Sequence, residues 1–159
     1  MPMTGEDAVQ KILSRLRNLC SRREYCVSDI REKALKALDG DGVGANTVVE
    51  SLVKDGYVSD RRYCAAYARE KASISGWGEV KIRHALSCKG ISRDDIDAGI
   101  AEIDADRATA RLERLLATKR KALGDDPQWK IKLLRFALGR GYRYDEVADA
   151  VSSMEKTQN

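Results

Sequence analysis

The chain repeats its pattern of apolar residues and glycines about every fifty residues, which restricts 159 residues to few folds. Residues 82–100 match residues 133–151 at a constant offset of 51, and Gly90 matches Gly141. The first third of the chain fits the same frame once four extra residues are allowed in the glycine-rich stretch 39–44. The sequence therefore predicts three related units, residues 1–58, 59–104 and 105–155.

The matched apolar positions should form the core of each unit, because a repeated fold needs equivalent buried residues. The equivalent residues are Ile30, Ile82 and Leu133; Ala34, Leu86 and Ala137; Val48, Ile96 and Val147; and Leu52, Ile100 and Val151.

Each unit is predicted to consist of helices. The only prolines are Pro2 and Pro127, and the chain between them is rich in residues that favour helix. Ile12, Leu16 and Leu19 follow the spacing of one apolar helix face, and no segment alternates apolar and polar residues over a useful length. We predict an all-α protein of about nine helices, each about 10 to 17 residues long.

Several helix ends can be predicted from local signals. Ser92 with Asp95 three residues later fits a capping box, and Asp126 followed by Pro127 fits a helix start. Gly90 and Gly141 fit the position that follows a helix. The units are therefore predicted to be three-helix pieces with short connections.

A lone unit of about fifty residues buries little apolar surface, so neighbouring units should stack and share apolar faces. We expect three tandem three-helix repeats in an elongated, curved, right-handed-type array. The alternative is a compact nine-helix bundle in which the repeat is only a trace of the chain's history.

Composition narrows the function classes. Basic and acidic residues nearly balance, 29 against 25, which is unlike a disordered tail or a polybasic arm. No apolar run has the length of a membrane span and the first residues do not resemble a signal peptide, so we expect a cytoplasmic protein with no membrane contact. The four cysteines lack metal-ligand spacing, and His84 is the only histidine. We therefore expect no metal and no cofactor, with the thiols serving as small core residues.

The excess positive charge lies in the last unit. Residues 105–159 carry 12 basic and 8 acidic residues, whereas both earlier units are neutral. On a helix, Arg107, Arg111, Arg114 and Lys121 would share one side, opposite the leucines. Such a stripe can bind a phosphate backbone or an acidic protein surface, although many charged helix faces are merely solvated.

Two further patterns resemble ligand-binding motifs but match them incompletely. Asp39, Asp41, Gly44 and Glu50 fall at calcium-loop positions, but Val43 replaces a ligand, so a glycine-rich turn is the preferred interpretation. Residues 76–78 (Gly-Trp-Gly) lack the rest of a phosphate loop and are interpreted as a helix breaker whose tryptophan packs between units. No arrangement of nucleophile and base is evident, so we do not expect an enzyme.

An ordered series of motifs resembles the bacterial RecX family. The series comprises residues 54–67 (KDGYVSDRRYCAAY), 76–86 (GWGEVKIRHAL) and 89–92 (KGIS), preceded by 21–24 (SRRE) and 28–33 (SDIREK) and followed by 140–142 (RGY). The resemblance covers about residues 8–152. It departs from the family at Ser59-Asp60, where an acidic pair is frequent, at Tyr63, where phenylalanine is frequent, and in the insertion at 39–44.

The resemblance implies tandem three-helix repeats and a non-enzymatic regulator of the RecA recombinase. Such proteins lie along the groove of the RecA–DNA filament and restrain ATP hydrolysis, strand exchange and coprotease activity in DNA repair, recombination and the SOS response. It implies RecA and its filament as partners, with DNA bound weakly, and a monomer is the simplest form. It carries no catalytic residue to this chain.

We therefore hypothesise a modulator that inhibits RecA by docking in the filament groove. Its candidate contact residues for DNA or RecA are Arg22, Arg23, Arg61, Arg62, Arg107, Arg111, Arg114, Lys121, Lys132, Arg135 and Arg140. One alternative is a stand-alone DNA-binding factor of helix-turn-helix type. Another is a helical scaffold for an unrelated acidic partner.

Overall fold

The computed structural model describes residues 4–157, which form nine α-helices and no strand. This confirms the all-α prediction, although the helices range from 9 to 19 residues. Their bounds are α1 Gly5–Cys20, α2 Val27–Ala37, α3 Gly42–Lys54, α4 Asp60–Ser73, α5 Glu79–Cys88, α6 Arg93–Ala101, α7 Ala105–Leu123, α8 Trp129–Gly139 and α9 Tyr144–Thr157. Within this part of the chain, none of the helices combines the length and apolarity needed to cross a bilayer.

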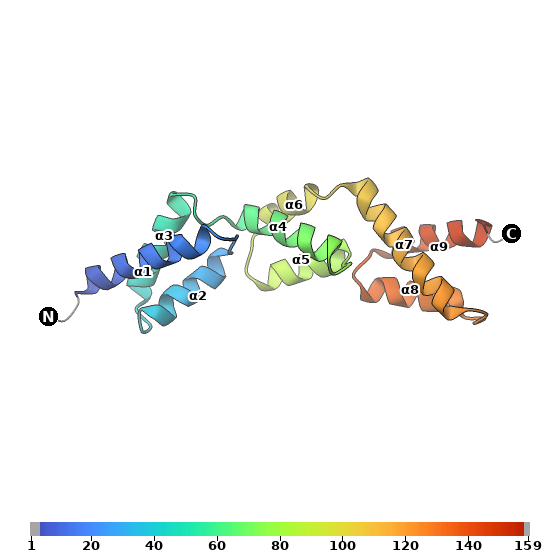
Figure 1. The fold of residues 1–159 in the computed structure, drawn as a ribbon, viewed down its shortest axis with the longest axis horizontal. Coiled ribbons are helices and arrows are strands. Elements are labelled where there is room, and N and C mark those ends of the chain that lie inside the picture. The colour runs from blue at the N-terminus through green and yellow to red at the C-terminus, as the bar shows by residue number, and fades with distance from the viewer. Residues whose placement is uncertain (1–3, 158–159) are drawn as a thin grey trace.

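The helices form three successive groups along one axis, with the two ends of the chain at opposite ends of the molecule (Figure 1). The groups are α1–α3, α4–α6 and α7–α9, and helices contact one another mainly within a group. The helical repeat array is therefore confirmed, and the compact bundle is excluded.

Each group has its own apolar core, at the positions that the repeat predicts. The equivalent residues Ile30, Ile82 and Leu133 are 0%, 1% and 0% exposed. Three separate clusters of buried residues follow the three groups, except that Cys26 packs into the second cluster. The division of the chain at 58/59 and 104/105 stays a prediction.

The helix ends follow the local signals in most cases. The Ser92 hydroxyl accepts a hydrogen bond from the backbone N–H of Asp95, and Gly90 and Gly141 follow their helices at φ +72° and +94°. The predicted helix start at Asp126 and Pro127 is wrong, because α8 begins at Trp129. The Asp126 carboxylate instead accepts from the backbone N–H of Gln128 and closes a local turn before the helix.

The turn in the glycine-rich stretch 39–44 is shorter than the sequence analysis predicts. Helix α3 begins at Gly42, so only residues 39–41 form the turn, and the Asp41 carboxylate caps the helix by accepting from the N–H of Gly44. Gly44 and Glu50 therefore lie inside a helix, which rules out the calcium-loop interpretation.

Backbone hydrogen bonds join the second and third groups. The N–H of Gly78 donates to the carbonyl of Arg140 at 2.8 Å, and the N–H of Val80 donates to the carbonyl of Gly141 at 2.9 Å. A Cβ on Gly78 would lie 2.5 Å from the backbone of Gly141, and one on Gly141 would lie 2.3 Å from the Cβ of Lys81. Only glycines permit this approach.

Trp77 lies beside this junction, as predicted. Its ring packs against the second cluster in an edge contact with Tyr67 at 6.5 Å between centroids. It also lines a cavity together with Ala105 and Tyr142 of the third group.

Polar side chains join the first and second groups. The Asp60 carboxylate accepts from the N–H of Val27 at 2.8 Å, and the Ser28 hydroxyl donates to the carbonyl of Lys89 at 2.8 Å. The Lys89 ammonium pairs with Asp29 at 3.0 Å. Burial alone would raise the pKa of Asp29, but the hydrogen bonds from Lys89 and Cys26 and the charges of Lys89 and Lys33 outweigh burial and lower it.

Three of the four cysteines are core residues, as predicted, and Cys88 is not. Cys20, Cys26 and Cys64 are buried, whereas Cys88 is exposed. Cys88 lies two residues after the buried Leu86, and two positions turn a helix by about 200°, so its side chain faces away from the core. Burial, with a smaller effect from the Asp60 charge, raises the pKa of Cys64 to about 12.

We predict that Gly141→Ala destabilises the protein far more than Gly124→Ala. Both glycines have positive φ, but a Cβ on Gly124 meets nothing within 4 Å. Gly124→Ala should cost about 1–2 kcal/mol for backbone strain, and Gly141→Ala about 1–3 kcal/mol more for the contact with Lys81. Chemical denaturation measures the free energy of unfolding of each variant. Equal decreases would show that the close approach of Gly141 to Lys81 does not contribute to stability.

We predict that one thiol, Cys88, reacts rapidly with a maleimide at pH 8. With a pKa of about 12, Cys64 is thiolate in only about one molecule in ten thousand at that pH, and it is fully buried. Mass spectrometry should find one fast label, which Cys88→Ser abolishes. A second fast label on the folded protein would contradict the buried positions of the other three thiols.

Candidate anion-binding groove

The predicted basic stripe is present on α7. Asp104 caps this helix by accepting from the N–H groups of Asp106 and Arg107, and the buried Leu112 and Leu116 turn one face toward the core. The charged residues lie on the other face because they recur at helical spacing. Of the four, Arg107, Arg114 and Lys121 are exposed and Arg111 is half-buried.

A groove of about 500 Å³ runs between this stripe, α8 and the residues that follow α4. Four cations line it, namely Arg111, Arg114, Lys119 and Arg140, and no acidic residue does. Its apolar lining includes Ile74, Leu115, Phe136 and Tyr142. The groove therefore offers concentrated positive charge above an apolar floor.

Aromatic contacts position two of the cations. The Phe136 ring lies 5.1 Å from the Lys119 ammonium and 5.2 Å from the Arg140 guanidinium, measured to the ring centroid. Burial raises the pKa of Tyr142, although the nearby Arg111 charge opposes the effect. Tyr142 therefore stays a neutral phenol near pH 7 and adds no negative charge to the groove.

Arg140 differs from the other three cations because it also holds the junction between the second and third groups. Its guanidinium donates to the carbonyl of Ser75 at 3.3 Å, and its own carbonyl accepts from Gly78. Among the described residues, Arg111, Arg114 and Lys119 form no ion pair. These three can bind an anion without breaking an internal ion pair.

The structure places the other predicted site residues outside this groove. Arg107, Lys121 and Arg135 are exposed on the third group, and Lys132 pairs with Asp126. Arg61 is exposed at the start of α4.

Two of the predicted arginines make internal contacts. Arg62 pairs with Glu24 and donates to the carbonyl of Gly56, which ties α4 to the chain before it. The Arg23 guanidinium lies over the Tyr25 ring at 4.5 Å.

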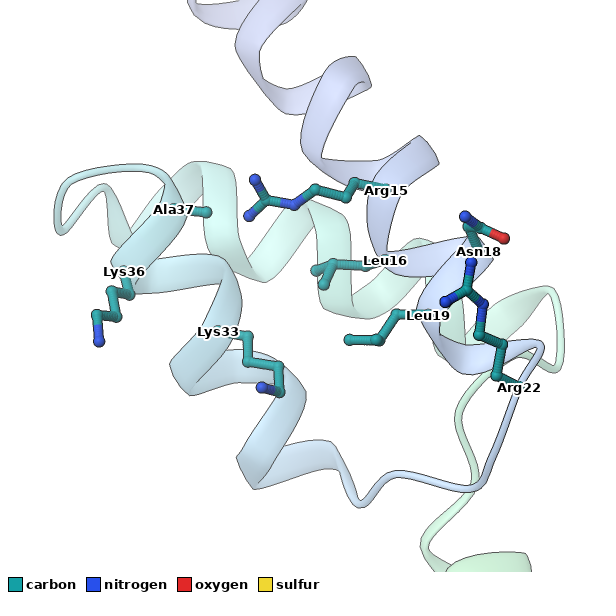
Figure 2. Close-up of a pocket in the computed structure, with 8 residues that line it drawn as sticks. All are labelled: Arg15, Leu16, Asn18, Leu19, Arg22, Lys33, Lys36 and Ala37. Carbon is teal, nitrogen blue, oxygen red and sulfur yellow. The ribbon is translucent and has the colours of Figure 1, made fainter.

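A second basic cavity lies in the first group, and of its four cations the sequence analysis named only Arg22. It measures about 550 Å³, and its cations are Arg15, Arg22, Lys33 and Lys36 (Figure 2). The first unit is neutral overall, so its net charge hides this local excess. Lys119 in the first-described groove was also missed, because it lies off the stripe on α7 and only tertiary packing brings it to Phe136.

Both cavities offer positive charge and hydrogen-bond donors. Arginine forks pair with carboxylates or phosphates, and lysines add point charges. The lining of the groove on α7 therefore has the chemistry that suits an anionic surface.

Comparison with known proteins finds similarity to RecX proteins. A family model described as "RecX, second three-helix domain" matches residues 59–100. A regulatory protein RecX of Clostridium botulinum strain Eklund 17B is 27% identical over 154 residues, which cover 94% of this chain and 71% of the relative. One of Escherichia coli strain SE11 is 24% identical, with 89% and 90% covered. Together these matches support the RecX family for this chain.

Solved RecX structures share its fold. A crystal structure of regulatory protein RecX superposes with a TM-score of 0.81 at 22% identity, covering 94% of this chain and 73% of the other. RecX from Lactobacillus salivarius gives 0.82 at 18% identity, covering 94% and 98%. The helical repeat array is thus the fold of these RecX structures.

We predict that Arg140→Ala destabilises the protein more than Arg114→Ala, because only Arg140 holds the junction between the second and third groups. Arg140→Ala should lower the free energy of unfolding by about 1–2 kcal/mol, because it removes the bond to Ser75 and the Phe136 contact. Arg114→Ala should change it by less than about 0.5 kcal/mol. Urea denaturation measures both, and a large loss for Arg114→Ala would mean that its stem packs across the junction.

Proposed function

We propose that this RecX-like protein binds RecA and RecA–DNA filaments and inhibits their recombinase, ATPase and coprotease activities in DNA repair and recombination. Similarity to RecX proteins along most of the chain supports the partner. The observation that carries the proposal is the groove of Arg111, Arg114, Lys119 and Arg140, which lacks acidic lining and lies on an elongated array (Figure 1).

The elongated shape suits a partner that is itself a repeated polymer. A rod with its apolar cores inside and its cations outside can contact several neighbouring subunits at once, which a compact bundle of the same size cannot. If the docked form favours one relative arrangement of those subunits, it disfavours the arrangement needed for hydrolysis. Inhibition then needs no reactive group on this chain.

The positive charge of the groove on α7 supports contact with phosphate or with an acidic protein surface. Arg111, Arg114 and Lys119 of the groove form no internal ion pair among residues 4–157, so neutralising a partner's charge breaks no internal ion pair. The number of free cations is small, however, and the electrostatic part of DNA affinity grows with the number of phosphates neutralised. Weak binding to DNA alone, strengthened by RecA, is the expected pattern.

The test follows ATP turnover by RecA on single-stranded DNA as the protein is added. We expect turnover to fall to a plateau. The triple variant Arg107→Ala, Arg111→Ala, Arg114→Ala should need at least about tenfold more protein for half-inhibition, because three contacts of about 0.5–1 kcal/mol are lost. Its affinity should also depend less on salt, by about 0.7 in the logarithmic slope for each lost single-strand phosphate contact.

A matched control removes the same charge elsewhere. Lys11, Arg31 and Lys54 are exposed on α1, α2 and α3 and line neither basic cavity. Their triple change to Ala should leave half-inhibition near that of the wild-type protein, and circular dichroism should show equal helix content for all three proteins. Unchanged turnover at saturating wild-type protein would refute the proposed inhibition.

The alternative of a stand-alone DNA-binding factor predicts a different result. It requires sequence-specific binding of duplex DNA without recombinase, with three-helix units acting as helix-turn-helix modules. A scaffold for an unrelated acidic partner would instead bind neither RecA nor its filament.

A further inference from the structure

The basic cavity of the first group results from the way its helices pack. Helices α1 and α2 each contact α3 more than they contact one another, so they splay apart above it. The space between them is the cavity of about 550 Å³. Figure 2 shows Leu16 and Leu19 pointing from α1 toward α2, with Lys33 and Lys36 on the facing helix.

The floor and the rim of this cavity differ in character. Leu16, Leu19 and Ala37 form an aliphatic floor, and Leu19 and Ala37 are only partly buried. Four cations and Asn18 make up the remaining lining, and no acidic residue belongs to it. The cations are Arg15, Arg22, Lys33 and Lys36.

These four cations have no internal ion-pair partner among residues 4–157. The acidic residues Asp29 and Glu32 line a neighbouring cavity of about 310 Å³, which shares Lys33 and Lys36. Asp29 is already engaged by Lys89. The positive charge at the rim is therefore available to a partner.

The aliphatic floor decides which class of anion fits. Proteins that hold single-stranded nucleic acid stack bases on aromatic side chains, and none of the eight lining residues is aromatic. Leucines and alanine instead suit an aliphatic side chain, and cations around them suit carboxylates. A helix that carries leucines along one stripe and glutamates on either side presents both features together.

We propose that the cavity between α1 and α2 is a docking site for an acidic amphipathic helix of a partner protein. The helix would place aliphatic side chains on Leu16, Leu19 and Ala37 and its carboxylates against the four cations. The site lies in a different group of helices from the groove on α7, and it does not depend on the proposed action on RecA.

The experiment measures fluorescence anisotropy of a labelled synthetic helix of about 18 residues, with leucines at i, i+3, i+4 and i+7 and glutamates beside them. A scrambled peptide of identical composition keeps the charge but loses the apolar stripe. An oligothymidylate of equal charge represents nucleic acid. The full chain is used throughout.

We expect the amphipathic peptide to bind at least about tenfold more tightly than the scrambled one, since only it can fill the aliphatic floor. The double variant Arg15→Glu, Lys36→Glu should weaken its binding by at least about tenfold, because two attractions become repulsions. The matched control is Arg31→Glu, Lys54→Glu, which makes the same charge change at exposed positions on α2 and α3 outside the cavity. It should stay within about twofold of the wild-type protein.

Three results would overturn the proposal. Equal affinity for the two peptides would reduce the site to non-specific attraction, and equal weakening by both double variants would do the same. Tighter binding of the oligothymidylate, lost in Arg15→Glu, Lys36→Glu but not in the control, would assign the cavity to nucleic acid. If the cavity variant proves unfolded by circular dichroism, Lys36→Gln alone, at an exposed helix position, should still weaken peptide binding relative to Arg31→Gln.

Discussion

Two backbone hydrogen bonds, from Gly78 to Arg140 and from Val80 to Gly141, join the last two groups of helices. Backbone groups have no rotamers, so a junction made from them has little freedom to tilt. The two backbone segments can approach because Gly78 and Gly141 have no Cβ. The Arg140 side chain adds a hydrogen bond to the carbonyl of Ser75. The direction of the rod, and the groove between α4, α7 and α8, both depend on this contact.

The junction between the first two groups is of another kind. It depends on side chains, chiefly the Lys89–Asp29 pair, the Asp60 cap on Val27 and the burial of Cys26 in the second core. These contacts are partly buried, and Cys26 is fully buried, so this junction combines polar side-chain contacts with apolar packing.

The two basic cavities show why net charge alone is a poor guide to binding surfaces. The last unit has an excess of cations, and part of that excess is used internally, as by Lys132 with Asp126. The first unit has no excess, yet packing gathers Arg15, Arg22, Lys33 and Lys36 on one side and leaves acids on others. Binding depends on the local arrangement of charge, because salt screens interactions between exposed charges beyond about 8 Å at physiological ionic strength.

The sequence by itself determined the helical class, the repeat and the positions of the core. Apolar spacing is a local property of each helix, and residues such as Ile30, Ile82 and Leu133 had to be buried in any stacked array. The stripe of Arg107, Arg111 and Arg114 was predictable for the same reason.

Only the tertiary structure decided which cations share a cavity. Lys119 and Arg140 both lie near the Phe136 ring, and Arg15 and Lys36 line one cavity, through contacts between helices that no single-helix pattern contains. Asp126 failed as a helix start because its carboxylate closed a turn with Gln128. The physical reason is common to these cases: periodicity reports which side of a helix is apolar, whereas the angle between helices determines what that side meets.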